Sequence, residues 1–303
     1  MTKEENKAPK LAGWKFTRGR LKYSVNESFF DIWSSQMAYL LGFTYADGNV
    51  YKTSLSWELQ KQDVNLLEKF RRTLKCTYPV VFGHGGLACR LRISNQVLVQ
   101  GILRLGLLPK KKFRFQIPRI PAKLLRHFIR GFLDGDGWIS IRANRNEIDV
   151  GFTGCNKDFL DVLNKKIAEV CCIHPGKIRK KAKITPNNCI STTYMVEFYS
   201  SQAFKILEWI FDNLEKDDLF LDRKYSKYLE AKKLHHFLKS GTRKVRIIQR
   251  IKRKTMEQIL KDLYLTKGFN GVEIAKALKV HSSSIYRWLA KTGIKYPVGR
   301  GVA

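Results

Sequence analysis

Two aspartates hold matching positions in an internal repeat of this chain. Residues 36–48 read QMAYLLGFTYADG and residues 125–137 read LRHFIRGFLDGDG, so Asp47 and Asp136 each stand directly before a glycine at the end of a helix-like segment. A carboxylate in the last turn of a helix meets the negative end of the helix dipole, which disfavours it by about 0.3–1 kcal/mol. If the two helices pair, the carboxylates also repel each other, and a divalent cation between them removes both penalties. The pair therefore predicts a metal site.

The chemistry of such a site follows from its ligands. Oxygen ligands with open coordination positions suit Mg²⁺, with Mn²⁺ as a substitute. Next to DNA, ions held in this way activate water and stabilise the leaving oxygen of a phosphodiester. Taken singly, either aspartate is better explained as a solvated turn residue, and it is the matched pair that favours a metal.

The segments that must position these aspartates contain small residues one helical turn apart. A glycine inside a helix costs about 1 kcal/mol relative to alanine, and close approach of a second helix backbone compensates for that cost. We therefore expect the two helices to cross on a pseudo-twofold axis. Gly48 and Gly137 are expected to stop the helices in a left-handed conformation. The small residues of the crossing are Gly42, Ala46, Gly131 and Gly135.

The residues after the two motifs also match each other. Each motif is followed by two β-type runs, an amphipathic helical run, two further β-type runs and a closing helix. The pattern predicts an α+β protein of two pseudo-symmetric αββαββα units and a small all-α C-terminal domain. The expected divisions are a basic N-terminal extension (1–26), a first unit (27–105), a linker (106–121), a second unit (122–238), a basic linker (239–254) and a helix-turn-helix-like domain (255–303).

The composition indicates a folded protein that binds a polyanion. The chain has 57 Lys and Arg against 26 Asp and Glu, a net charge of +31, and 44% hydrophobic residues. Such a charge on a globular composition favours nucleic acid as the partner. No apolar stretch approaches the roughly 20 residues that a membrane helix needs, so no membrane partner is expected.

Six cysteines are present, none in a C-x-x-C pair. Cys171, Cys172 and His174 lack a second ligand pair at zinc-finger spacing, which disfavours zinc. Free thiols predict a reducing compartment. We expect a soluble intracellular protein, in the cytoplasm of a bacterium or phage host or in an organelle.

LLGFTYADG at residues 40–48 and IRGFLDGDG at residues 129–137 resemble the motifs of the LAGLIDADG homing endonucleases, in their single-chain form with two motif copies. The resemblance covers roughly residues 27–235. It implies that the motif helices form the central interface and that Asp47 and Asp136 bind the catalytic metals, with the backbone carbonyl regions of Gly48 and Gly137 as weaker candidates. It also implies saddle-shaped antiparallel sheets in the major groove, cleavage of double-stranded DNA across the minor groove, and a monomer.

Two departures from the family pattern concern the surroundings of these aspartates. Tyr45 replaces the aspartate common at the sixth motif place, a position that is not the metal ligand, while Asp134 keeps it. The family also places basic and polar residues near the scissile phosphates at the end of the second strand, where Gln60 and Lys61 stand. A solvated strand end explains these two residues equally well. The second half reads Thr153, Gly154 and Cys155 there and lacks the lysine.

Sequence recognition is expected from strand side chains that alternate toward DNA. Arginine pairs with guanine and asparagine with adenine in the major groove, while many basic side chains contact only phosphates. The differences between the halves imply a long target that need not be palindromic. The candidates for DNA contact are Lys52, Ser54, Ser56, Glu58, Arg90, Arg92, Arg142, Asn144, Arg145, Lys177, Arg179, Lys181 and Lys183.

The C-terminal part has a DNA-binding pattern of its own. The run SGTRKVRIIQRIKRKT at residues 240–255 contains no acid, and Arg243, Lys244, Arg246 and Arg250 are candidates for phosphate contact. Helices are expected at 257–265, 270–278 and 282–291. The last two resemble a helix-turn-helix with Ser282 as N-cap and with Ser283, Ser284, Tyr286 and Arg287 facing a groove. A small packing subdomain is the alternative.

Three other functions fit parts of this pattern. A transcription regulator that fuses a degenerate LAGLIDADG core to a helix-turn-helix tends to lose the carboxylate pair, so the presence of Asp47 and Asp136 favours the nuclease. An RNA maturase shares the fold and the charge and remains open as a second activity. An intein-embedded nuclease is disfavoured, because the chain begins at Met1 and ends at Ala303 without a terminal His-Asn.

Overall fold

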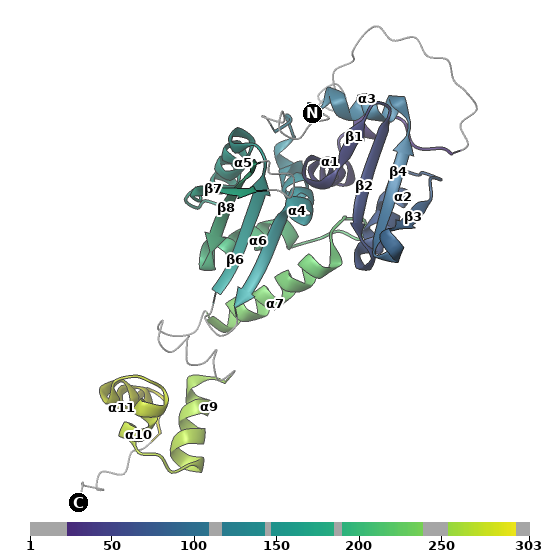
Figure 1. Cartoon of the computed structure of the whole chain (residues 1–303). Helices are drawn as coiled ribbons and strands as arrows, with labels where there is room; N and C mark the ends of the chain where they lie inside the picture. Colours follow the sequence, from purple (N-terminus) through teal and green to yellow (C-terminus); the bar gives the residue numbers. More distant parts are fainter. Residues whose placement is uncertain (1–22, 109–116, 143–146, 185–189, 239–253, 295–303) are drawn as a thin grey trace, which may run out of the picture. The chain divides into compact units, whose positions relative to one another are not determined.

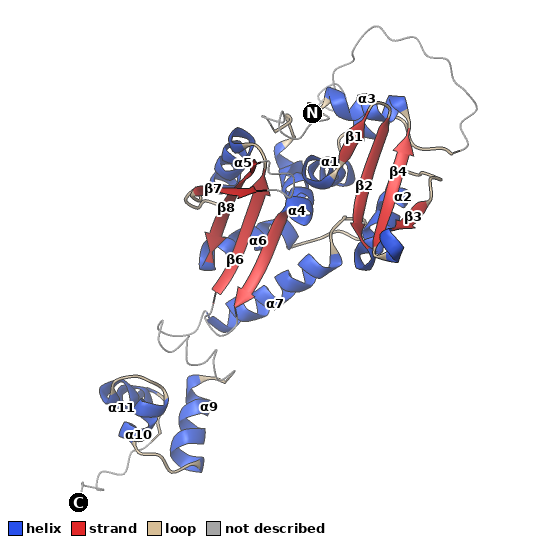
Figure 2. Cartoon of the chain, in the orientation of Figure 1, coloured by secondary structure: helices blue, strands red, loops and turns tan. Residues whose placement is uncertain are grey.

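The structure is a computed structural model that describes residues 23–108, 117–142, 147–184, 190–238 and 254–294. The chain forms two compact units, one of Met1–Ser140 with Ile148–Glu230 and the other of Ile141–Glu147 with Ala231–Ala303. Figure 1 follows the elements along the chain, and Figure 2 separates helices from strands. No helix in these described ranges is long and apolar enough to cross a membrane.

The first unit contains the αββαββα pattern twice. The first copy consists of α1 (Ser35–Asp47), β1 (Asn49–Tyr51), β2 (Ser54–Gln60), α2 (Val64–Thr73), β3 (Val80–Gly83), β4 (Ala88–Ser94) and α3 (Gln96–Arg104). The second consists of α4 (Leu125–Asp136), β5 (Gly137–Arg142), β6 (Glu147–Gly154), α5 (Lys157–Val170), β7 (Ile178–Ile184), β8 (Ile190–Tyr199) and α6 (Ser200–Phe211). Helix α7 (Asp222–Leu238) follows.

The two sheets have the same strand order. The first runs β1-β2-β4-β3 and the second runs β5-β6-β8-β7. Helices α1 and α4 lie side by side between the two sheets (Figure 1). The fold class predicted from the repeat is therefore confirmed.

Helix α1 is buried along almost its whole length, as expected of a helix that is apolar on all sides. Ser34 caps its first turn by accepting from the Met37 N–H. The Phe70 ring of α2 packs edge-on against Phe43 of α1 and Trp57 of β2, with ring centroids 5.3 Å apart in each pair. These contacts fix α1 to the inner face of the first sheet.

The second copy repeats this packing with its own aromatic residues. Phe132 of α4 contacts Phe159 of α5 at 5.2 Å between ring centroids and Phe152 of β6 at 6.4 Å. Helix α4 is thus held on its sheet as α1 is held on the first.

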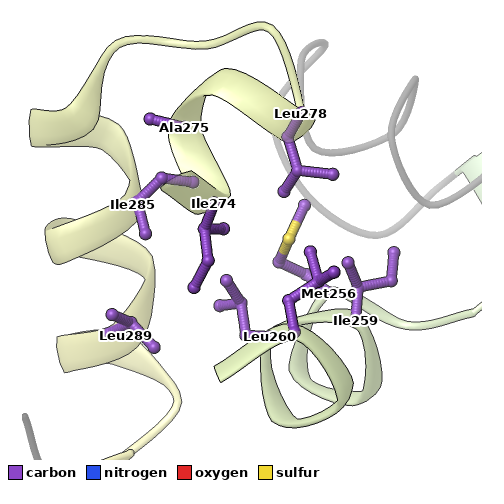
Figure 3. Close-up of a cluster of buried hydrophobic side chains, with 9 residues drawn as sticks. Met256, Ile259, Leu260, Ile274, Ala275, Leu278, Ile285 and Leu289 are labelled. Carbon is purple, nitrogen blue, oxygen red and sulfur yellow. The ribbon is translucent and has the colours of Figure 1, made fainter. Parts of the chain in front are cut away.

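The second unit contains three short helices around one apolar cluster. They are α9 (Met256–Lys261), α10 (Gly271–Ala277) and α11 (Ser282–Lys291). Figure 3 shows the cluster, to which each helix contributes. Its buried side chains are Met256, Ile259, Leu260, Leu263, Ile274, Ala275, Leu278, Ile285 and Leu289.

The ends of these helices differ in two places from the sequence expectation. The helix expected over 257–265 ends at Lys261 and continues as a π-helical turn over Asp262–Thr266, in which Leu263 stays in the core. The N-cap of α11 is His281 and not Ser282. The Nδ1 atom of His281 lies 2.8 Å from the Ser283 Oγ, and it accepts from the Ser283 N–H, so an imidazole performs the capping that we had assigned to a hydroxyl.

Candidate functional site

The motif helices approach so closely that only glycine fits at their contact. A Cβ atom on Gly42 would lie 2.0 Å from the carbonyl oxygen of Phe128 in α4, and one on Gly131 would lie 2.1 Å from the carbonyl oxygen of Tyr39 in α1. Real Cβ atoms do not come this close to a carbonyl oxygen. The close crossing predicted from small residues at helical spacing is therefore present, and it explains why both helices tolerate internal glycine.

The glycines at the ends of the two helices do not have the conformation that we expected. Gly48 has φ −75° and ψ 142°, and Gly137 has φ −113° and ψ 173°, so both are extended and neither is left-handed. The chain passes directly from helix into strand at both places. Glycine is needed there for space, since a Cβ would lie 2.3 Å from Thr44 Cγ2 at Gly48 and 2.6 Å from Leu133 Cδ1 at Gly137.

Asp47 and Asp136 are the last residues of α1 and α4. A Cβ built on Gly135 would lie 2.4 Å from the Ala46 Cβ and 3.5 Å from the Asp47 Cβ. Asp47 therefore sits against the residue that directly precedes Asp136. The crossing thus brings the two predicted carboxylates to the same end of the helix pair.

A buried lysine of α7, which sequence reasoning missed, lies at this end. The Nζ atom of Lys224 donates to the carbonyl oxygens of Leu133, of Asp134 at 2.8 Å and of Gly137 at 2.7 Å. The side chain is almost fully buried. It therefore satisfies carbonyls at the C-terminal end of α4, where a cation is also favoured by the helix dipole.

The charge of Lys224 interacts with both motif aspartates. Burial lowers the pKa of Lys224 from 10.5 to about 8. The negative charges of Asp134, then of Asp47 and Asp136, oppose this shift. One ammonium group thus lies within electrostatic reach of both carboxylates. No local motif marks Lys224 in the sequence, because it stands in a helix that is otherwise highly charged.

Asp136 borders a small hollow on the second half of the unit. The hollow is lined by Tyr45, Phe132, Asp136, Gly154, Cys155, Asn156 and Phe159. Thr153 Oγ1 donates to the Asp136 carbonyl oxygen at 2.8 Å. The end of β6 thus lies against Asp136, and by the internal repeat Gln60 and Lys61 occupy the equivalent end of β2. Both Gln60 and Lys61 are exposed.

The two residues at the sixth motif place are structural. Tyr45 stacks on Phe159 with ring centroids 5.7 Å apart, and its hydroxyl donates to the Leu105 carbonyl oxygen at 3.3 Å. Asp134 is buried, and its Oδ2 accepts from the Tyr39 hydroxyl at 2.7 Å and from the Leu221 N–H at 2.8 Å. Burial raises the pKa of Asp134.

The donor set at the ends of α1 and α4 fits a magnesium ion. Mg²⁺ is commonly held by one or two carboxylates, with waters and substrate phosphates completing its octahedral coordination. The two motif aspartates supply that number of carboxylates. Within the described ranges, no group of three or more His, Cys, Asp and Glu side chains is close enough to form an all-protein metal cage.

The candidate DNA-contacting residues of the first sheet lie on one face. The register places Ser54 opposite Ser94, Ser56 opposite Arg92 and Glu58 opposite Arg90. The residues between them, such as Leu55, Trp57, Leu91 and Ile93, are buried on the other face. Lys52 is exposed in the turn before β2.

Several of these residues are already engaged within the protein. Ser54 is buried, and its hydroxyl donates to the Tyr51 carbonyl oxygen at 3.1 Å. Glu58 forms an ion pair with Arg90, and its Oε1 lies 3.2 Å from His84 Nε2. The hydrogen bond from Arg90 lowers the pKa of Glu58.

The candidates of the second sheet also share a face where the structure describes them. Lys177, Arg179 and Lys181 are exposed. Arg179 Nη1 donates at 3.0 Å to Glu197 Oε2, which also accepts from the Tyr199 hydroxyl at 2.8 Å. Arg142 lies in β5 and Lys183 in β7, but their side chains are outside the described residues, as are Asn144, Arg145, Arg243, Lys244, Arg246 and Arg250.

Helix α11 carries the candidates of the second unit. Ser283, Tyr286 and Arg287 are exposed and Ser284 is half-buried, while Ile285 and Leu289 face the core. The Tyr286 ring also covers the start of α10, since a Cβ on Gly271 would lie 2.6 Å from it. Tyr286 therefore packs the two helices together as well as facing solvent.

No family model and no curated protein matches the chain. Among solved structures, it is similar to the LAGLIDADG meganuclease I-AabMI bound to uncleaved DNA, with 16% identity, a TM-score of 0.49, and coverage of 77% of this chain and 98% of that one.

Two further solved structures are also similar to the chain. The I-LtrWI LAGLIDADG homing endonuclease bound to target DNA has 13% identity, a TM-score of 0.44, and coverage of 78% of this chain and 98% of that one. Full-length DUF199/WhiA from Thermatoga maritima has 15% identity, a TM-score of 0.39, and coverage of 88% of this chain and 94% of that one.

Proposed function

We propose that this protein is a site-specific endonuclease that hydrolyses double-stranded DNA with divalent metal ions bound at Asp47 and Asp136. The observation that carries the proposal is the meeting of these two residues at one end of the α1–α4 crossing, where glycine contacts hold the helices together. Two carboxylates placed at the same end of a helix pair repel each other, and a divalent cation bound between them removes that repulsion.

Each residue near the crossing has a separate task in the proposed reaction. Bound Mg²⁺ supplies the activation of water and the neutralisation of charge on the leaving oxygen. Asp47 and Asp136 hold the metal. Thr153 fixes the Asp136 carbonyl, and Lys224 fixes the carbonyls of Asp134 and Gly137. Together they hold the Asp136 carboxylate in place.

Gln60 and Lys61 are proposed to act on the scissile phosphate in the first half, on the basis of their exposure and their place at the end of β2. A metal contact of the Gly48 and Gly137 carbonyl regions stays a prediction. The Gly137 carbonyl oxygen already accepts from Lys224 at 2.7 Å, so any metal would share it with an ammonium group.

The exposed faces of the two sheets are proposed to bind the major groove on either side of a cut made across the minor groove. Both faces carry exposed basic side chains, Arg90 on the first sheet and Arg179 and Lys181 on the second, which suit contact with phosphates and bases. Because the two faces carry different residues, the target is expected to be long and not palindromic. One chain supplies both aspartates, so the protein acts as a monomer.

The helical unit is proposed to add contacts through α11. Arg287 and Ser283 are exposed on this helix, and the helix is held against α10 by a complete apolar cluster. A basic exposed face on a rigid helix pair is the arrangement that helix-turn-helix proteins insert into the major groove.

Incubation of the full chain with a randomised DNA library and Mg²⁺, followed by sequencing of the cut ends, tests the proposal. We expect a single preferred target. Asp47→Asn and Asp136→Asn should each abolish cleavage and leave DNA affinity within a few-fold, whereas Asp158→Asn, an exposed aspartate of α5, should cut normally. If either motif variant loses binding together with cleavage, these aspartates are structural and the nuclease assignment is wrong.

A further inference from the structure

The exposed face of the first sheet carries a carboxylate among its basic residues. Glu58 lies on the face with Arg90 and Arg92, which the proposed function places against DNA. A carboxylate there repels phosphate. Its ion pair with Arg90 is solvent-exposed, and such pairs contribute little to stability. The presence of Glu58 on this face therefore calls for an explanation other than folding.

Both oxygens of Glu58 are used by basic neighbours. Oε2 accepts from the Nε of Arg90 at 2.6 Å and also contacts its Nη2. Oε1 lies 3.2 Å from His84 Nε2. The register sets Glu58 directly opposite Arg90 on the neighbouring strand, so the pair forms without a long reach of either side chain.

The position of His84 depends on an unusual turn. His84, Gly85 and Gly86 have φ angles of 50°, 63° and 85°, three consecutive left-handed residues between β3 and β4. Left-handed backbone is accessible to glycine and strained for most other residues. The turn directs His84 back over the sheet to Glu58. The carboxylate is thereby fixed from two sides.

Fixing Glu58 also fixes the guanidinium of Arg90. The edge formed by Nε and Nη2 is occupied by the carboxylate, so the adjacent edge, formed by Nη1 and the second N–H of Nη2, is left for another partner. A guanidinium edge with two parallel N–H groups matches the O6 and N7 acceptors of guanine in the major groove. The Arg90 side chain is 52% exposed, so this edge is open to a ligand.

A hollow of about 720 Å³ lies beside these groups. Its lining includes Glu58, His84, Arg90 and Arg92 on the charged side and Tyr78 and Val81 on the apolar side. The edge of a base pair has the same mixed character, with acceptors next to apolar ring edges or a thymine methyl.

We propose that Arg90 reads a guanine in the half of the target bound by the first sheet, and that Glu58 and His84 are positioning residues that hold its guanidinium. The inference rests on the proposed DNA-binding function and revises the expectation that Glu58 itself contacts a base. It names the base class that one position of the target must contain.

The test is selection of bound DNA from a randomised library in EDTA, where DNA stays uncut, with the wild-type chain and with Arg90→Ala and Arg90→Lys. Wild type should enrich guanine at one position. Both variants should lose that preference by a factor of roughly 5–150, the range for loss of a bidentate base contact. Lysine retains the charge but not the two-pronged geometry. If Arg90→Ala weakens binding to all sequences equally and guanine stays enriched, Arg90 is a phosphate contact and the inference is wrong.

Glu58→Gln separates positioning from simple repulsion. Loss of the negative charge should leave overall affinity equal or higher, because repulsion of phosphate is removed, while the guanine preference at the same position falls. Higher affinity with an unchanged guanine preference would overturn the positioning role. Failure of the nuclease proposal has a different signature, in which the selected DNA is bound with the expected preference but is not cut after Mg²⁺ is added.

Discussion

Replacement of Lys224 by methionine tests whether a buried charge holds the end of α4 and with it Asp136. The Nζ atom donates to three carbonyl oxygens, of which that of Leu133 also accepts from the Gly137 N–H. The other two bonds, made by a charged donor, contribute about 3–6 kcal/mol together. Desolvation lowers the pKa of Lys224 from 10.5 to about 8, a penalty of about 3 kcal/mol at about 1.4 kcal/mol per pH unit. We expect K224M to lower the free energy of unfolding at pH 7 by about 2 kcal/mol.

The pH dependence of this difference follows from the direction of the pKa shift. The folded-state pKa of Lys224 is about 8, below its ordinary value of 10.5, so between these pH values the unfolded chain binds more protons than the folded chain. Wild-type stability relative to K224M should therefore rise with pH across this window. Below pH 8, Lys224 is charged in both the folded and the unfolded chain, so the full cost of desolvating its charge opposes folding.

Urea unfolding at pH 7 and near pH 9.5 measures both effects. The control is K227M, because Lys227 lies one turn further along α7 and donates to a single carbonyl, that of Ile139, at 2.8 Å. Because Lys227 is exposed, solvent weakens its bond, and K227M should change the free energy of unfolding by less than about 1 kcal/mol. We also expect K224M to cut DNA 10- to 100-fold more slowly, roughly as for loss of a group that orients metal ligands. Equal stability of K224M and wild type at both pH values, with normal cleavage, would refute this reasoning.

Further changes test the helix crossing, the buried network and the DNA surface. Gly42→Ala and Gly131→Ala should each lower the free energy of unfolding, measured by thermal unfolding, by more than about 3 kcal/mol because of the backbone clash. Gly154→Ala, whose Cβ would lie 3.9 Å from its nearest neighbour, should be tolerated. Equal effects of the three changes would contradict the crossing. Tyr39→Phe should lower unfolding free energy by about 1–3 kcal/mol, because Asp134 loses a buried donor, and no change would show that water replaces it. DNA affinity should fall steeply as salt rises, and a flat dependence measured by fluorescence anisotropy would contradict the polyanion assignment. Truncation after Leu238 should weaken binding and broaden the range of sites cut, and unchanged affinity would mean that the helical unit does not bind DNA.

The repeat made much of the fold predictable. Glycines at helical spacing in both motifs have a single structural reason, the contact of two backbones, so the α1–α4 crossing follows from Gly42 and Gly131. Strand alternation likewise predicted which side chains share the exposed face of the first sheet. In both cases a periodic pattern reports local geometry directly.

Features that depend on long-range contacts were not predictable in this way. Lys224 contacts Asp134 of α4 across 90 residues of sequence, and its sequence context is that of an ordinary charged helix. The conformations of Gly48 and Gly137 depend on the strands that follow and not on helix-stop preference. The engagement of Glu58 by His84 depends on a turn whose left-handed residues bring a loop over the sheet.

Binding of Mn²⁺ to the DNA complex, followed by electron paramagnetic resonance, is the most direct test of shared metal binding at the helix crossing. We predict that the wild-type complex takes up Mn²⁺ tightly and that Asp47→Asn and Asp136→Asn each weaken this binding at least ten-fold, roughly as expected when one of two carboxylates is lost. Uptake that is unchanged in both variants would show that the carboxylates do not hold the metal.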